Sequence, residues 1–285
     1  MIDNNFFNIK DVSYIKVGGF VKGFLETSDI NKVKEIILKE KKIRFIGNTT
    51  NTLFSFDYSD TFFVKYLGKN IEIEDDFIVC ECGVSLSFLA SFSLKYNISS
   101  FYQFSLIPGL LSGAIVTNAS SYGKAISHDL LFIEVMTLEG KFKIIKKEEI
   151  IFSYHDSSLK EENFFIYKAY FKKRTSRHDI KPLKSYYETK KLTTQDYSLK
   201  SLGSTFQNIN YFPIGKMIQK EWKNKINLYK CKFSSIHGNF LLVSSSLPYE
   251  NILKLIESTS LLLYNKLGFD LQKEIEMIEE QGKSG

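Results

Sequence analysis

The chain has little cysteine and no long apolar run. Cys80, Cys82 and Cys231 are the only cysteines; they form no even disulfide framework, and Cys80-x-Cys82 lacks the second ligand pair that a zinc site needs. No apolar run reaches the roughly 18 residues that span a bilayer, and the start, MIDNNFFNIK, lacks the basic and apolar regions of a signal peptide. We therefore expect a protein of the reducing cytoplasm, without membrane insertion and without a metal site.

Arginine is also scarce. The net charge of +6 rests almost entirely on lysine, since Arg44, Arg174 and Arg177 are the only arginines. Enrichment in Lys, Ile, Asn and Phe often reflects an AT-rich genome, and an anionic small ligand accounts for the charge as well as a nucleic acid does. We expect no nucleic-acid partner. The apolar fraction of 44% indicates a packed fold, and 285 residues suffice for two or three small domains around a ligand.

The order of helix and strand patterns predicts a mixed α and β fold. Asp29 to Lys42 has the spacing of an amphipathic helix, and 172–200 is polar and basic, as expected of a domain boundary. Further helices are predicted at 85–95, 214–223 and 248–267, and strands at 43–46, 61–66, 70–73, 77–81, 130–138, 141–145, 164–171, 228–233, 240–244 and 270–277.

Two segments stand out for glycine and small polar residues. The loop Gly47–Asn51 follows a short buried strand, so its amides and the Thr50 and Asn51 side chains could donate to phosphate oxygens. By itself, a loop of this kind is more often an ordinary strand-to-strand turn rich in Asn and Thr. Ile107 to Gly123 is apolar but interrupted by glycines, which permit close approach to a ligand; the alternative is a buried irregular connector.

Taken in order, several motifs resemble those of the UDP-N-acetylenolpyruvoylglucosamine reductase (MurB) family. The matching stretches are Val17-Gly18-Gly19, Gly47–Asn51, Ile107-Pro108-Gly109 with Gly113-Ala114 and Asn118, Phe152–Ser157, Gly203-Ser204-Thr205-Phe206, His237-Gly238-Asn239-Phe240 and Leu271–Ile275. No single stretch is decisive, but together they identify the chain as a divergent member of the shorter class of this family.

The resemblance implies an α+β fold with a vanillyl-alcohol-oxidase/MurB-like, two-part FAD-binding domain at 1–175 (lobes of about 1–58 and 59–175). A smaller α/β substrate-binding domain follows at 176–285, and its last strand returns to the active site. The implied activity is NADPH-dependent reduction of the enolpyruvyl group of UDP-N-acetylglucosamine enolpyruvate to UDP-N-acetylmuramate in peptidoglycan synthesis, by a cytoplasmic monomer with FAD and NADPH as cofactors.

The same resemblance implies roles for individual residues. The expected catalytic residues are the proton donor Ser204, Glu274 and His155, and the expected substrate-binding residues are Tyr154 and Asn208. The expected FAD-binding residues are Gly47, Asn48, Thr49, Thr50, Asn51, Pro108, Gly109, Gly113, Ala114 and Asn118.

The chain departs from the family pattern at several of these positions. His155 stands where the family has an arginine, whose fork would bind the substrate carboxylate with a fixed charge. Thr49, Leu106, Ser112 and Ser120 replace glycines, and Gln207, Gln219 and Gln272 replace charged residues. Threonine at position 49 argues against a positive φ there. His237 and Asn239 can instead have a structural role, by holding the strand that begins at Phe240. We favour this role for His237.

The histidine at position 155 is compatible with three outcomes. With His155 the enzyme is slower, another cation such as a lysine compensates, or the chain binds FAD and a UDP-sugar without reacting. A related FAD oxidoreductase with another substrate is the remaining possibility, because a fold does not determine a substrate.

Overall fold

The chain passes repeatedly between two packed units. The computed structural model describes residues 6–54, 57–209, 213–222, 231–244 and 247–278. Unit 1 comprises Met1–Lys22, Thr49–Asp60 and Lys191–Gly285, and unit 2 comprises Gly23–Asn48 and Thr61–Lys190. These units are defined by packing, whereas the expected division at 175/176 is one of ligand binding and stays a prediction.

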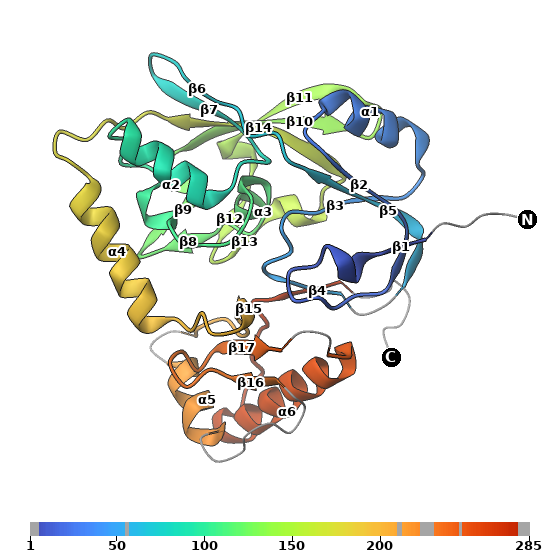
Figure 1. Cartoon of the computed structure of the whole chain (residues 1–285), viewed down its shortest axis with the longest axis vertical. Helices are drawn as coiled ribbons and strands as arrows, with labels where there is room; N and C mark the ends of the chain where they lie inside the picture. Colours follow the sequence, from blue (N-terminus) through green and yellow to red (C-terminus); the bar gives the residue numbers. More distant parts are fainter. Residues whose placement is uncertain (1–5, 55–56, 210–212, 223–230, 245–246, 279–285) are drawn as a thin grey trace, which may run out of the picture. The chain divides into compact units, whose positions relative to one another are not determined.

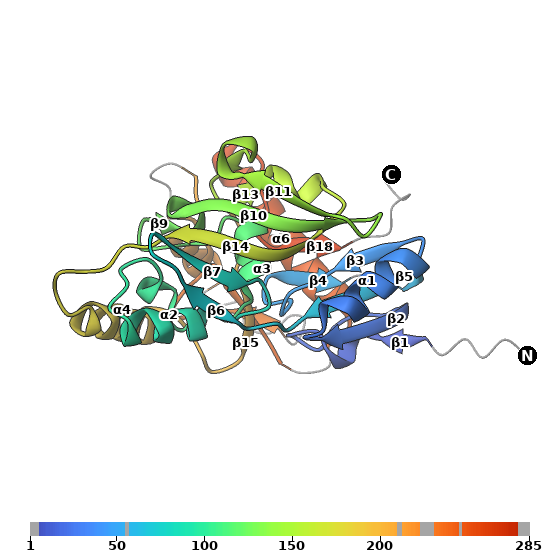
Figure 2. The ribbon, with the colours of Figure 1, turned by 90° about the horizontal axis from the view of Figure 1, so that it is seen from above.

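Unit 2 is built on a five-stranded sheet in the order β11-β10-β14-β7-β6, whose strands lie side by side in Figure 2. The strands are β6 (Ile71–Ile73), β7 (Phe77–Glu81), β10 (Leu130–Thr137), β11 (Phe142–Lys146) and β14 (Phe164–Lys172). All neighbouring strands are antiparallel. The hairpin predicted from 130–138 and 141–145 is confirmed as β10 and β11.

Unit 2 contains the helices α1 (Ile30–Lys39), α2 (Leu86–Lys95) and α3 (Leu111–Val116) and most of a further helix described below. The first follows the amphipathic prediction. Asp29 caps it by accepting a hydrogen bond from the Asn31 amide at 2.9 Å, and Val33 and Ile37 are buried in one cluster with Phe165. The second and third helices belong to the larger core, which also holds Cys80 and Cys82. Burial raises the pKa of both thiols, so they act as core residues.

Short strands complete unit 2. They are β8 (Ser120–Ser121), β9 (Lys124–Ala125), β12 (Phe152–Ser153) and β13 (Asp156–Ser157), and each consecutive pair forms a small antiparallel hairpin. Strands β1 (Phe7–Asn8), β2 (Phe20–Thr27), β5 (Tyr58–Tyr66) and β3 (Ile43–Phe45) make a further sheet in that order. Of these four strands, β3 belongs to unit 2 and β1 to unit 1, and β2 and β5 each have residues in both units.

Unit 1 holds a three-stranded sheet in the order β15-β17-β16, with two helices beside it (Figure 1). The elements are β15 (Lys200–Ser204), α5 (Ile214–Trp222), β16 (Cys231–Phe233), β17 (Phe240–Val243) and α6 (Tyr249–Leu267). Pro248 precedes α6 as predicted, and Gly268 ends it with a left-handed φ of 76° and an amide that donates to Tyr264 O. Strand β4 (Thr52–Phe54) pairs in parallel with β18 (Glu276–Ile278).

Several elements differ from the prediction, among them strand β2, which was not predicted at all. The polar stretch 172–200 contains a helix, α4 (Lys181–Thr194), because Tyr187 packs on Tyr102 and Tyr122, with ring centroids 5.9 and 4.5 Å apart, instead of on the aliphatic side chains that reveal a helix in sequence. The last predicted strand, 270–277, is shortened to β18, and of the predicted strand 228–233 only 231–233 lies within the described residues.

None of the helices in the described ranges combines the length and the hydropathy needed to cross a membrane.

Candidate functional site

The two glycine segments adjoin within unit 2. A Cβ added at Gly47 would lie 3.9 Å from the backbone N of Gly113, whereas a Cβ at Gly113 would meet no heavy atom within 4 Å. The start of α3 is tied to the chain beyond β7, because the amides of Leu111 and Ser112 donate to Val84 O at 2.8 Å and Cys82 O at 2.9 Å. These two amides are therefore already used in hydrogen bonds within the fold. The open face of α3 lies at Gly113, where an added Cβ would meet no neighbouring atom.

Asn118 connects this segment to the hairpin β12–β13. Its Nδ2 donates to Ser153 O at 2.7 Å, while its Oδ1 is buried and accepts no hydrogen bond from the residues that the structure describes. The Ser157 hydroxyl adds a second tie by donating to Val116 O at 2.6 Å. A buried amide oxygen without a donor is costly, so Asn118 Oδ1 is a natural acceptor for a bound ligand.

Tyr154 and His155 form the turn of that hairpin. Tyr154 is 54% exposed and its ring lies edge-on to His155, with centroids 4.4 Å apart. His155 has a positive φ of 53°, and its Nε2 lies 3.2 Å from Ser120 Oγ. Burial, and then the charge of Lys160, lower the pKa of His155 below its usual value. The imidazole is therefore neutral at pH 7, unlike an arginine.

Two positions where glycine was expected retain a glycine-like backbone. Thr49 has a φ of 54° and Leu106 a φ of 62°, so the expectation that threonine disfavours a positive φ at position 49 is wrong. The physical reason at position 49 is a hydrogen bond: Thr49 Oγ1 accepts from the Tyr14 amide at 2.8 Å, and the side chain is buried. Such conformations cost about 1–2 kcal/mol and concentrate at functional sites.

The second group of candidate residues lies in unit 1, around the end of strand β15 at Ser204. Ser204 ends β15 opposite Phe240, after Gly203, whose φ of 82° favours glycine. Asn239 clamps the next two residues: its O accepts from the Thr205 amide at 2.8 Å, its Nδ2 donates to Phe206 O at 2.7 Å, and its Oδ1 accepts from the Phe206 amide at 3.1 Å. Asn239 is 1% exposed, so its role is structural.

Glu274 lies directly beside this strand. Its amide donates to Thr205 O at 2.9 Å, and its own O accepts from Asn51 Nδ2 at 3.1 Å. These two hydrogen bonds join Glu274 to Asn51 and to Thr205, the residue next to Ser204, in unit 1. Burial raises the pKa of Glu274 from 4.5 to about 7, so its carboxyl is half protonated near neutral pH and is able to donate or accept a proton.

The structure also describes four other residues considered in the sequence: Asn208, Gln207, Gln219 and His237. Asn208 is exposed on the loop after Phe206. The backbone N–H of Gln207 donates a hydrogen bond to Gln272 O at 2.8 Å. Gln219 Nε2 donates to Ser235 O at 2.9 Å. His237 packs on Phe240, with centroids 4.2 Å apart, and its amide donates to Ser234 Oγ at 3.1 Å, which agrees with the structural role favoured for it.

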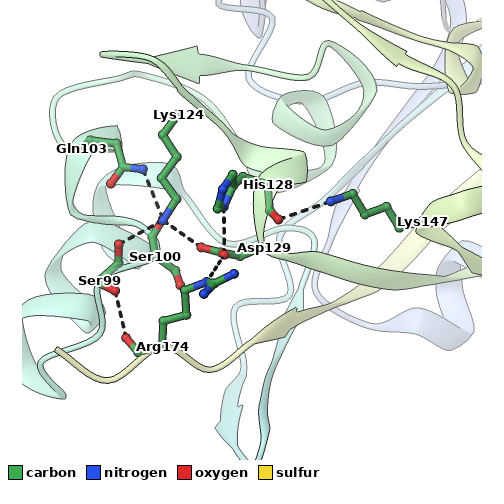
Figure 3. Close-up of polar contacts among 8 residues, drawn as sticks. All are labelled: Ser99, Ser100, Gln103, Lys124, His128, Asp129, Lys147 and Arg174. Carbon is green, nitrogen blue, oxygen red and sulfur yellow. Dashed lines mark hydrogen bonds and ion pairs between the residues drawn. The ribbon is translucent and has the colours of Figure 1, made fainter.

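An ion cluster that the sequence did not reveal follows the glycine segment in unit 2. Figure 3 shows Lys124, His128 and Arg174 converging on Asp129, with Lys124 Nζ 2.8 Å from Oδ2 and Arg174 Nε 2.5 Å from Oδ1. Burial alone would raise the pKa of Asp129, but hydrogen bonds from Lys124 and Arg174 outweigh it and lower the pKa to about 2. Lys124 also donates to Ser99 O at 3.1 Å, so the cluster anchors the end of this segment.

The site residues thus fall into two sets. Unit 2 holds Gly47, Asn48, Pro108, Gly109, Gly113, Ala114, Asn118, Tyr154 and His155, and unit 1 holds Thr49, Thr50, Asn51, Ser204, Asn208 and Glu274. The contact of Ser120 with His155 and the anchoring of Thr49 by Tyr14 were missed, because no local sequence pattern signals a hydrogen bond between distant segments.

Comparison with known proteins agrees with this arrangement. A family model described as the C-terminal domain of UDP-N-acetylenolpyruvoylglucosamine reductase matches residues 195–278. A crystal structure of UDP-N-acetylenolpyruvylglucosamine reductase (MurB) from Thermus caldophilus has the same fold, with a TM-score of 0.82 at 19% identity over 96% of this chain and 98% of that chain.

Two curated relatives, both named UDP-N-acetylenolpyruvoylglucosamine reductase, match nearly the whole chain. The protein from Thermotoga petrophila is 30% identical over 268 residues, 92% of this chain and 94% of its own length. The protein from Aquifex aeolicus is 29% identical over 284 residues, 97% of this chain and 95% of its own length. The fold and these relatives define a class, the FAD-dependent oxidoreductases. Within it, the chain belongs to the UDP-N-acetylenolpyruvoylglucosamine reductase family.

Unit 2 offers features that fit a flavin nucleotide. They are the open face over Gly113, the adjoining Gly47 and the buried Oδ1 of Asn118. Glycines allow a planar ring or a diphosphate to approach the backbone, and an orphaned acceptor suits the ring N–H of a flavin. The residues present are therefore compatible with the cofactor that the family implies.

Proposed function

We propose that the protein reduces the enolpyruvyl group of UDP-N-acetylglucosamine enolpyruvate to give UDP-N-acetylmuramate, with NADPH as the electron source and FAD as the bound cofactor. Family membership supports the substrate class. The observation that supports the mechanism is the backbone hydrogen bond that joins Glu274 to Thr205, the residue after Ser204, together with the pKa of Glu274, which burial raises to about 7.

When bound, FAD supplies the hydride, which adds to the terminal CH₂ carbon of the enol ether. Ser204 donates the proton that completes the α-carbon, so that one C=C bond is replaced by two C–H bonds. Protonated Glu274 donates a hydrogen bond to the substrate carboxylate and stabilises the negative charge that accumulates there. This role of Glu274 requires that its carboxyl group is still protonated near neutral pH, and the raised pKa of Glu274 meets that requirement.

The remaining candidate residues bind the ligands in this proposal. Gly47, Gly113 and Asn118 bind FAD together with Asn48, Thr49, Thr50, Asn51, Pro108, Gly109 and Ala114. His155 donates to the substrate carboxylate, and Tyr154 and Asn208 contact the UDP-sugar. Asn51 Nδ2 already donates to Glu274 O, so its second N–H hydrogen and its Oδ1 are the groups assigned to the cofactor.

The substrate domain in this proposal is 176–285, supported by the match of the C-terminal family model to 195–278. A monomer in the cytoplasm, acting in cell-wall biogenesis, cell shape and cell division, completes the proposal. Three buried free cysteines are compatible with a reducing compartment.

The test separates the two half-reactions. Purified protein should show a flavin absorbance spectrum, NADPH should bleach it, and the enolpyruvyl UDP-sugar should restore the colour while UDP-N-acetylmuramate forms. A protein without flavin, or a reduced flavin that the UDP-sugar fails to reoxidise, would contradict the proposal.

One observation favours a second candidate, a homologue that binds FAD and a UDP-sugar but reacts poorly. His155 is neutral at pH 7 because burial and Lys160 lower its pKa, so it does not supply the fixed charge of an arginine. This candidate predicts UDP-sugar binding to the reduced protein without product formation.

A further inference from the structure

Two of the chain's departures from the family pattern meet in space. Ser120 Oγ lies 3.2 Å from His155 Nε2, although the residues stand 35 positions apart. A hydroxyl has been added at position 120, where a glycine was expected, and a shorter side chain stands at position 155. The contact joins the candidate FAD segment to the candidate substrate-binding turn within unit 2.

The hairpin that carries His155 is held independently of this contact. Asn118 Nδ2 donates to Ser153 O at 2.7 Å, and Ser157 Oγ donates to Val116 O at 2.6 Å. The first bond ends on a backbone oxygen of the hairpin, and the second links the Ser157 side chain of the hairpin to a backbone oxygen of α3. Both hold the hairpin against the glycine segment, and neither involves the imidazole. Ser120 is different, because it contacts the imidazole itself.

The direction of the Ser120 hydrogen bond depends on the tautomer of His155. Across the described ranges, His155 Nε2 is the one side-chain or backbone atom to which the Ser120 hydroxyl is bonded. A neutral imidazole has one nitrogen that accepts and one that donates. The positive charge of Lys160, which is paired with Asp156 at 2.7 Å, disfavours a second proton on the ring.

We propose that Ser120 is a positioning residue. Its hydroxyl donates to Nε2 of His155 and holds the imidazole in the tautomer that carries its proton on Nδ1, so that the Nδ1–H group donates to the substrate carboxylate when substrate is bound. The role of His155 in this inference rests on the proposed function, whereas the pairing of the two side chains does not. Ser120 and His155 together replace one arginine, with orientation supplied by a hydrogen bond instead of a fixed charge.

The kinetic test compares matched variants of the FAD-loaded protein. Ser120→Ala and Ser120→Gly should lower kcat/KM for the enolpyruvyl UDP-sugar about five- to tenfold, the effect of losing one neutral hydrogen bond, and leave flavin reduction by NADPH unchanged. Ser120→Thr, which keeps the hydroxyl, should retain most of the activity. Ser87→Ala, an exposed serine on α2, serves as the control and should match the parent.

Two readouts separate positioning from general loss of structure. In ¹⁵N spectra, His155 should populate the Nδ1–H tautomer in the parent and a mixture in Ser120→Ala. In a His155→Arg background, Ser120→Gly should no longer lower kcat/KM, because the arginine does not depend on the hydroxyl.

Equal tautomer populations in the parent and Ser120→Ala would overturn the proposal. So would an equal loss in the His155→Arg background, or a loss of bound flavin as the main effect of Ser120→Ala. If the parent protein fails to turn over the UDP-sugar, the proposed function is refuted, but the ¹⁵N comparison still decides whether Ser120 sets the tautomer of His155.

Discussion

The two units hold their candidate site residues in different ways. In unit 1, Glu274 and the residues after Ser204 are placed by backbone hydrogen bonds and by the clamp of the buried Asn239. In unit 2, the contact between Ser120 and His155 joins two side chains directly. Positions held through the backbone tolerate a change of side chain, whereas side-chain links must change together. The departures at Ser120 and His155 form such a pair.

The largest effect is expected for the chemistry assigned to unit 1. Ser204→Ala should lower the rate of substrate reduction by about 10²–10⁴-fold, the usual contribution of a positioned acid, because the α-carbon loses its proton donor. The rate of flavin reduction by NADPH, measured by stopped-flow absorbance, should stay unchanged. An undiminished turnover would remove Ser204 from the mechanism.

The clamp in unit 1 should have the next largest effect. Asn239→Ala deletes two hydrogen bonds to Phe206 and leaves a buried amide and carbonyl without partners, so it should destabilise the protein by about 2–4 kcal/mol. Urea unfolding followed by fluorescence measures this loss. Gln219→Ala, which removes one bond at a less buried side chain, is the matched control and should cost about 1 kcal/mol or less.

Glu274 connects the chemistry to pH. Its pKa is raised from 4.5 to about 7, so the folded state keeps a proton that the unfolded state releases in this range. The resulting stability is complete below about pH 4.5 and is lost as the pH rises through 7. Glu274→Gln should therefore gain about 2 kcal/mol relative to the parent between pH 5 and pH 8. Parallel stability curves for the two proteins would show that the carboxyl is not perturbed.

In unit 2, His155 of the Ser120–His155 pair can be replaced by the arginine expected at this position. His155→Arg should raise kcat/KM for the UDP-sugar about five- to tenfold, since a charged bidentate donor binds a carboxylate more strongly than a neutral imidazole. An unchanged kcat/KM would indicate that a lysine already compensates. Lys160, whose charge acts on His155, is the one to examine, and Lys160→Met would then lower activity.

The smallest effect is expected at the strained loop. Thr49→Ala keeps the positive φ and loses the acceptor of the Tyr14 amide, so it should destabilise the protein by about 1 kcal/mol or slightly more. Thr49→Gly also loses the bond but relieves the backbone, and its destabilisation should be smaller. Thermal unfolding of both variants measures the difference, and a more damaging glycine would show that the backbone is unstrained.

The regular elements were largely predictable from the sequence. The helix that follows Asp29, the hairpin of β10 and β11 and the Pro-led helix α6 depend on local spacing, caps and turns, and all three are confirmed. Helix α4 was not predictable, because its packing uses tyrosine rings contributed by Tyr102 and Tyr122 from elsewhere in unit 2. The prediction that Thr49 avoids a positive φ was wrong, because the hydrogen bond that holds Thr49 comes from the Tyr14 amide, 35 residues away.

By itself, the sequence determined the α+β class, the order of the motifs and the resemblance to a family, because these depend on local composition and spacing along the chain. The tertiary structure decided which atoms serve the fold and which remain for a ligand. It assigned the first amides of α3 to Val84 and Cys82, oriented Glu274 beside Thr205 in a buried setting, and brought Ser120 to His155. Hydrogen bonds and burial between distant segments exist only once the chain has folded, so no local pattern encodes them.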